Sequence, residues 1–172
     1  LEIIMESSRS SSIDFNGKDN EGLTAFQLIC TAGHSETVNI FMENTTMLTL
    51  SIDFNVKDKY GSTAFHLACI EGYSEVVKIF MEYAETLCID LNAKDNRGRT
   101  GFIWACINCH SEVVEIFMEN SGSLDIDLNE KDNGGLTAFH QACTEDHSEV
   151  VKIFMENAKT LSIDLNENGS VG

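Results

Sequence analysis

Apolar residues recur along this chain at spacings of three and four, in short runs that glycine and polar residues separate. One such run contains Val76, Val77, Ile79 and Phe80. This spacing places the apolar side chains on one side of a helix, which predicts a helix that buries a single face. A shorter apolar run, AFHLAC, precedes it and predicts a first helix. The local unit is therefore a pair of helices.

Polar residues beside these runs predict where the helices begin and end. Thr63 stands before the first run as an N-cap, and His66, three residues later, can reach back toward it. Gly72 is placed to end the first helix in a left-handed conformation, and Ser74 to cap the second helix. Residues 58–61 (DKYG) then form the turn that enters the unit, with glycine at a position of positive φ.

A comparison of the sequence with itself shows four complete copies of this unit. The copies DNEGLTAFQLIC, DKYGSTAFHLAC, DNRGRTGFIWAC and DNGGLTAFHQAC begin at Asp19, Asp58, Asp95 and Asp132, so they lie 39, 37 and 37 residues apart. The predicted repeats are 19–57, 58–94, 95–131 and 132–165, with a partial repeat at 1–18 and the start of a degenerate repeat or a tail at 166–172. The partial repeat consists of the end of a second helix and its loop. It predicts that the chain is cut from a longer protein.

A single helix pair cannot cover its own apolar face, so the copies are expected to stack and to bury one phenylalanine each. These are Phe26, Phe65, Phe102 and Phe139. The unit resembles the ankyrin repeat, whose Thr-Pro-Leu-His-x-Ala run is matched by Thr63, His66 and Ala68, and by Thr137, His140 and Ala142. The resemblance implies an all-α solenoid of stacked helix-turn-helix units joined by β-turn or hairpin-like loops.

The chain departs from the family pattern in four ways. Proline is absent, and alanine or glycine takes its place. Phenylalanine replaces the family leucine. Gln27 and Ile103 replace the family histidine in two copies, which is expected to weaken the local caps. The period exceeds the ankyrin norm of about 33 residues, and the surplus falls after the second helix, which predicts a longer helix or loop there.

The charge of the chain restricts its partners. It is −17, from 28 acidic and 11 basic residues, a field that repels phosphate backbones and anionic lipid surfaces. No segment approaches the roughly 20 apolar residues of a membrane-spanning helix. We therefore expect neither nucleic acid nor membrane as a partner, and we expect a protein partner with a basic surface or a basic peptide.

Cysteine usage favours a structural role. Cys106, Cys109 and His110 spell C-x-x-C-H, a haem-attachment sequence out of context. In the repeat register, however, Cys106 corresponds to Cys30, Cys69 and Cys143, which predicts one buried core thiol per repeat, too far apart to share a zinc ion. No cofactor or metal is expected, although a metal or redox role of the cysteines is kept as a weaker hypothesis. Six thiols without a paired framework indicate a reducing compartment, the cytoplasm or the nucleus.

No catalytic group stands out from its copies. Histidines precede the second-helix serines in three repeats, as His34, His110 and His147. A serine that caps a helix has its hydroxyl occupied, and no third group completes a catalytic arrangement. The histidines are therefore predicted to hold neighbouring repeats together, and the chain is predicted not to be an enzyme.

The ankyrin resemblance implies that partners bind a concave face made by the turn tips and the exposed side of the first helices. Carried over position by position, the candidate partner-binding residues are Tyr60, Ser62, Ile70, Glu71, Arg97, Arg99, Trp104, Ile107, Asn108 and Leu136. Trp104 either fills a groove between helices or anchors an interface together with Arg97 and Arg99, which form a basic island on an acidic molecule.

The resemblance raises one modification and leaves one alternative function. Asn55, Asn92 and Asn129 occupy the asparagine position that asparaginyl hydroxylases modify in some family members; the competing interpretation is that each amide satisfies turn backbone. The alternative function is a structural spacer without a dedicated ligand. Apolar residues in the last helix and the first remnant also predict either a fragment or end-to-end association with further copies.

Overall fold

The computed structural model describes residues 14–48 and 50–165, and these residues form eight helices arranged in four pairs. The first helices of the pairs are α2 (Ala25–Thr31), α4 (Ala64–Glu71), α6 (Gly101–Ile107) and α8 (Ala138–Thr144). The second helices are α3 (Ser35–Leu48), α5 (Ser74–Tyr83), α7 (Ser111–Asn120) and α9 (Ser148–Asn157). The remnants at both ends, including the apolar stretch near the N-terminus, lie outside the described residues.

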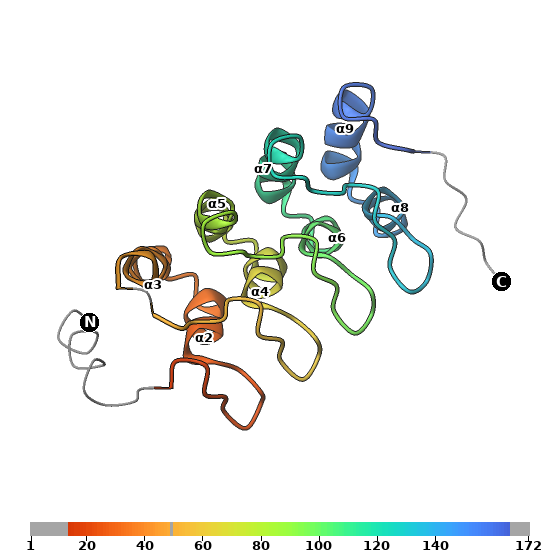
Figure 1. Ribbon diagram of the computed structural model, residues 1–172. Coiled ribbons are helices and arrows are strands. Elements are labelled where there is room, and N and C mark those ends of the chain that lie inside the picture. Colours follow the sequence, from red (N-terminus) through yellow and green to blue (C-terminus); the bar gives the residue numbers. More distant parts are fainter. Residues whose placement is uncertain (1–13, 49, 166–172) are drawn as a thin grey trace.

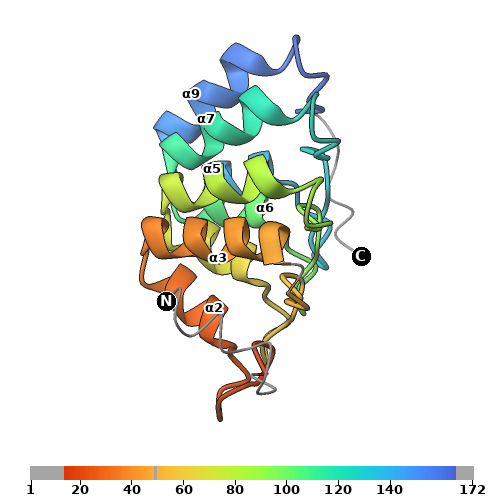
Figure 2. The same cartoon turned by 60° about the vertical axis from the view of Figure 1, so that its left-hand side comes forward.

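The helix pairs stack into two layers. Each first helix packs against the first helices of the neighbouring pairs, and the second helices form a parallel row beside them (Figures 1 and 2). Loops project from the row of first helices, away from the second helices (Figure 1). No strand forms in the described part of the chain, which contains only isolated bridges between Lys18 and Thr24 and between Lys131 and Thr137. The predicted all-α solenoid is confirmed.

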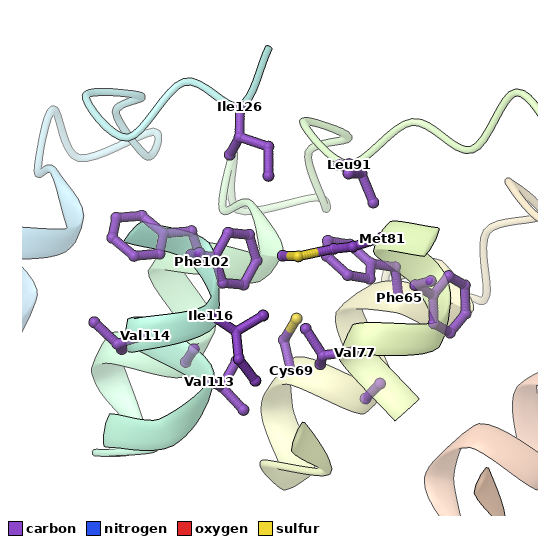
Figure 3. Packing of buried hydrophobic residues seen from close by; sticks show 14 of the residues in the cluster. Phe65, Cys69, Val77, Met81, Leu91, Phe102, Val113, Val114, Ile116 and Ile126 are labelled. Atoms are coloured by element: carbon purple, nitrogen blue, oxygen red, sulfur yellow. The ribbon is translucent and has the colours of Figure 1, made fainter. Parts of the chain in front are cut away.

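Phenylalanine rings connect the two layers and the successive repeats. The Phe65 ring lies 5.4 Å from that of Phe80 in its own repeat and 5.7 Å from that of Phe117 in the next. Phe102 repeats the pattern with Phe117 and Phe154, at 5.1 and 5.7 Å. Figure 3 shows part of this core, where Met81 lies between Phe102 and Phe65, and Cys69, Val77 and Ile116 lie beside them. The prediction of one buried phenylalanine per repeat is confirmed in the first three repeats, whereas the fourth, Phe139, is only half-buried.

The first helices begin with the predicted threonine caps. The Thr63 hydroxyl accepts from the His66 backbone N–H, while His66 Nδ1 accepts from the Thr63 backbone N–H at 3.2 Å. The expectation that Gln27 weakens its cap is wrong, because its side chain accepts from the Thr24 N–H at 2.8 Å and closes the same reciprocal pair. Ile103 has no side-chain polar group, so Thr100 caps α6 alone.

The second helices begin differently from the prediction. Ser74 is the first residue of α5, and Tyr73 is the cap residue but makes no side-chain cap bond. His110 and His147 are likewise the cap residues of α7 and α9, and their side chains make no cap bond either. The cause is a tight turn: Gly72 has φ of 75°, and the Ser74 N–H donates to its carbonyl at 3.0 Å, so the helix starts one residue early. The serine hydroxyls are therefore not occupied as helix caps.

The predicted ladder of buried cysteines is correct for Cys30, Cys69 and Cys106 and wrong for Cys143. Cys143 is exposed because no described helix packs on the outer side of α8. Burial raises the pKa of the Cys69 and Cys106 thiols well above the ordinary value, which keeps them protonated and unreactive.

Asparagines join the segments that follow the second helices. Asn92 Nδ2 donates to the Asp125 carbonyl at 2.9 Å, and its Oδ1 accepts from the Asp127 N–H at 3.0 Å. Asn16, Asn55 and Asn129 make the same two bonds to the following repeat. The amides thus satisfy turn backbone, as one of the two interpretations expected, but the backbone is that of the next repeat.

Candidate functional site

Each loop that projects from the first-helix layer is a turn closed by an aspartate. Oδ1 of Asp58 accepts from the backbone N–H groups of Tyr60 and Ser62, both at 2.8 Å. Gly61 takes φ of 81° at the end of this turn, as predicted. Asp19, Asp95 and Asp132 close the other turns in the same way. The turn tips therefore present their side chains on a fixed backbone.

Neighbouring turns are also tied to one another. The Asn96 backbone N–H donates to the Tyr60 carbonyl at 3.0 Å, and its side chain donates to the Lys59 carbonyl at 3.2 Å. A Cβ on Gly61 would lie 2.5 Å from Asn96 Oδ1, so this approach requires glycine. Asn133 repeats the contact one turn further on.

A cavity of about 280 Å³ opens between the turns and first helices of the second and third repeats. Its lining residues are Asp58, Tyr60, Ser62, Leu67, Ile70, Asp95, Asn96, Arg97 and Trp104. We call it the α4–α6 cleft. It brings together five predicted partner-binding residues: Tyr60, Ser62, Ile70, Arg97 and Trp104.

Trp104 is fixed in one orientation at this cleft. Its Nε1 donates to Oδ2 of Asp95 at 2.9 Å, and the Arg99 guanidinium carbon lies 4.7 Å from the centre of its ring. The side chain is half-buried. The two interpretations of Trp104 are therefore compatible, because one part of the indole packs against its own turn while another lines the cleft.

The two arginines have different environments. The Arg99 side chain is only 18% exposed, and its Nε lies 3.6 Å from Oδ2 of Asp132, which balances its charge. Arg97 is exposed at the rim of the cleft. The basic island expected from the sequence is thus reduced to Arg97, since Arg99 supports Trp104 and pairs with the next turn.

The remaining predicted partner-binding residues lie outside the cleft lining. Glu71 and Asn108 are exposed, and Ile107 and Leu136 are half-buried. The Asn108 side chain donates to the Ile70 carbonyl at 3.1 Å, a contact between repeats. Sequence reasoning missed Asp58, Leu67 and Asp95 because the aspartates recur in every repeat. A signal was present nonetheless, since the residue nine positions after each aspartate changes from leucine to tryptophan and glutamine.

Two of the three histidines that were predicted to hold neighbouring repeats together, His110 and His147, make such contacts. His110 Nε2 lies 2.8 Å from the Ile70 carbonyl, and His147 Nε2 lies 2.7 Å from the Ile107 carbonyl. His66 Nε2 likewise lies 3.0 Å from the Arg99 carbonyl. These ring nitrogens are engaged with backbone of the adjacent repeat and do not converge on a common point.

Two classes of feature are not found within the described ranges. No group of three or more His, Cys, Asp or Glu side chains there could hold a metal ion. No helix there is long and apolar enough to cross a membrane.

Comparison with known proteins identifies the family. The family model for ankyrin repeats (3 copies) matches residues 2–90 and 82–168. A search of curated proteins gave no match. The two matched segments together cover almost the whole chain and agree with the stacked helix pairs, so the chain belongs to the ankyrin-repeat family.

Proposed function

We propose that this chain is a non-enzymatic module that binds a partner protein at the α4–α6 cleft. Ankyrin repeats are generally protein–protein interaction modules. The observation that carries the proposal is the composition of the cleft. Tyr60, Arg97 and Trp104 occur once each in the repeat register, whereas the residues shared by all repeats are used in contacts that build the stack.

The cleft has the properties of a protein-binding hot spot. It combines two aromatic side chains with an arginine, the residue types enriched at interface centres, and Tyr60 is 63% exposed. The turns that carry these side chains are joined by hydrogen bonds within and between repeats. A partner therefore meets a preorganised surface, and little conformational entropy is lost when it binds.

The charge of the molecule favours a basic partner. With −17 in total, the chain speeds the encounter with a basic protein or peptide at low ionic strength. Four of its basic side chains, Lys59, Lys78, Lys94 and Lys152, pair with glutamates. These pairs leave the excess of acidic residues uncompensated, so the field that a partner meets is acidic overall.

Affinity capture from a reducing cell extract tests the proposal. The parent chain is compared with a Tyr60→Ala, Arg97→Ala variant, because both side chains are exposed at the cleft and neither fills the core. A Met155→Ala, Lys159→Ala variant is the control, since it removes an exposed apolar and an exposed basic side chain from the far end of the stack. All three should unfold at similar temperatures.

We expect a basic protein to be retained by the parent and the control and lost by the cleft variant, with retention falling as salt rises. Retention of the same proteins by all three chains would contradict binding at the cleft. Retention by none would favour the alternative, a structural spacer.

A further inference from the structure

The third and fourth repeats contain an internal hydrogen bond that the second repeat lacks. In the third repeat, Trp104 Nε1 donates to Oδ2 of Asp95 at 2.9 Å. In the fourth, Gln141 Nε2 donates to Oδ2 of Asp132 at 2.7 Å. In both cases a planar side chain with an N–H group on the first helix fills the space beneath the turn and satisfies the second carboxylate oxygen.

The second repeat has leucine at this position. Asp58 uses Oδ1 for the two backbone N–H groups of its turn, and Leu67 has no hydrogen to donate to Oδ2. Within the described part of the chain, no side chain donates to Asp58 Oδ2. Asp58 and Leu67 both line the α4–α6 cleft, so the cavity lies where Trp104 and Gln141 place a donor in later repeats.

The cleft walls define what could fill this space. Tyr60, Leu67, Ile70 and Trp104 provide apolar and aromatic surface. The acidic groups are Asp58 and Asp95, and Asp95 already accepts from Trp104. The basic group in the lining is Arg97, which is exposed at the rim. Beside the lining, Lys59 lies over one face of the Tyr60 ring at 5.0 Å and Arg99 over one face of the Trp104 ring at 4.7 Å, so an occupant meets the other face of each ring. A fitting occupant is flat, carries N–H donors and a positive charge, and has an apolar stem.

We propose that the α4–α6 cleft binds an arginine side chain of the partner, with the guanidinium donating to Oδ2 of Asp58 and lying against the aromatic side chains of Tyr60 and Trp104. This inference rests on the proposed function and specifies its partner chemistry. Arginine fits better than lysine because a guanidinium is planar, stacks on aromatic rings and is less strongly hydrated. The acidic charge of the whole chain acts in the same direction.

A short peptide tests this chemistry without the natural partner. The probe is Ac-Gly-Arg-Gly-NH2, titrated into ¹⁵N-labelled protein, with lysine and citrulline peptides for comparison. Trp104 is the only tryptophan, so its indole N–H gives one NMR signal inside the cleft. We expect the arginine peptide to shift this signal with a Kd on the order of millimolar, and the other two peptides to bind at least about threefold more weakly.

Two variants locate the binding site. Asp58→Asn keeps an Oδ1 acceptor for the turn and removes the charge, and we expect it to weaken arginine binding about tenfold. Asp19→Asn makes the same change in a turn outside the cleft lining and should leave binding unchanged. Leu67→Gln should abolish binding while the protein stays folded, because its amide would reach Asp58 as Gln141 reaches Asp132.

The outcomes separate the inference from the proposed function. Equal binding of the three peptides, or unchanged arginine binding in Asp58→Asn or in folded Leu67→Gln, would overturn the inference. If the arginine peptide does not bind while protein capture still depends on Tyr60 and Arg97, the inference fails and the proposed function stands. If the peptide binds as expected and no protein is captured, the cleft chemistry is right and the proposed function fails.

Discussion

Single side chains in this protein act mainly through the neighbouring repeat. His66 shows the principle: Nδ1 accepts from the Thr63 N–H of its own cap, and Nε2 faces the Arg99 carbonyl of the next repeat. This geometry assigns the neutral tautomer with hydrogen on Nε2, since a carbonyl cannot donate. A second proton on Nδ1 would face a backbone N–H. Burial removes the ring from water, which disfavours the charged form and lowers the pKa of His66 below its ordinary 6.5.

His66 should make stability depend on pH. The unfolded chain takes up this proton first as pH falls, so the contribution of His66 is complete above about pH 6.5 and is lost below it. We expect the unfolding free energy of the parent to fall between pH 7 and pH 5, by up to ~1.4 kcal/mol per pH unit for one proton. His66→Gln should flatten that dependence, since Gln27 occupies the same position with complete hydrogen bonding.

Urea unfolding at several pH values measures both curves. Parallel curves for the parent and His66→Gln would contradict the prediction. They would show that the His66 imidazole binds the same number of protons in the folded and unfolded states over this pH range.

Residue-scale features were predictable where their cause is local in sequence. The threonine cap and Gly72 depend on neighbours within one helix, and both were predicted. The partner of His66 is a carbonyl 33 residues away, which depends on the distance between stacked repeats. The serine caps were misplaced because one positive-φ residue shifts the helix start, and a sequence pattern does not specify a dihedral angle to that precision.

All of the described helices except α3, which has 14 residues, are too short to be stable alone. Helix α6 has 7 residues and α7 has 10, below the roughly 12–15 residues at which isolated helices become marginal in water. Packing between equivalent helices therefore determines their stability. The sequence predicted this arrangement from its period, but it did not predict the α4–α6 cleft, because a cavity arises from the sizes of side chains that meet across two repeats.

Gly101 shows how closely the first helices approach. A Cβ at this position, which is alanine in the other repeats, would lie 2.9 Å from Cys69 Sγ and 3.2 Å from Phe65 Cε1. We expect Gly101→Ala to lower the unfolding free energy by about 1–2 kcal/mol through overpacking, despite the better helix propensity of alanine. Cys69→Ala removes the sulfur and should reduce that cost in the double variant.

A double-mutant cycle by urea unfolding measures this coupling. We expect a favourable interaction of at least about 0.5 kcal/mol between the two substitutions. Additive costs would mean that α6 moves away from α4 instead of pressing on Cys69.

At the scale of the whole molecule, stability passes from repeat to repeat. Asparagine and histidine bonds and the alternating phenylalanine rings each connect one repeat to the next. A stack with contacts only between neighbours behaves approximately as a one-dimensional chain of coupled units. The position of a substitution along the stack should therefore matter as much as its chemistry.

Phe102 and Phe139 occupy the same register position and allow this to be tested. Phe102 is 1% exposed and contacts Phe117 and Phe154. Phe139, on α8, is half-buried and contacts Phe154. We expect Phe102→Ala to cost about 3–5 kcal/mol and Phe139→Ala clearly less, because the second cavity opens at the side of α8 on which no described helix packs.

The interior substitution should also change cooperativity, because it removes the ring contact with Phe117 inside the third repeat and the ring contact with Phe154 of the fourth repeat. In Phe102→Ala, hydrogen exchange should then show α7 and α9 opening at lower free energy than α4 and α5, with a broadened or two-step urea transition. In Phe139→Ala the loss of protection should be confined to α8 and α9. The opposite result would be an equal loss of unfolding free energy in both variants, with hydrogen-exchange protection lost evenly along the chain. It would mean that the repeats unfold as one unit and that their coupling is stronger than the contacts between neighbouring repeats explain.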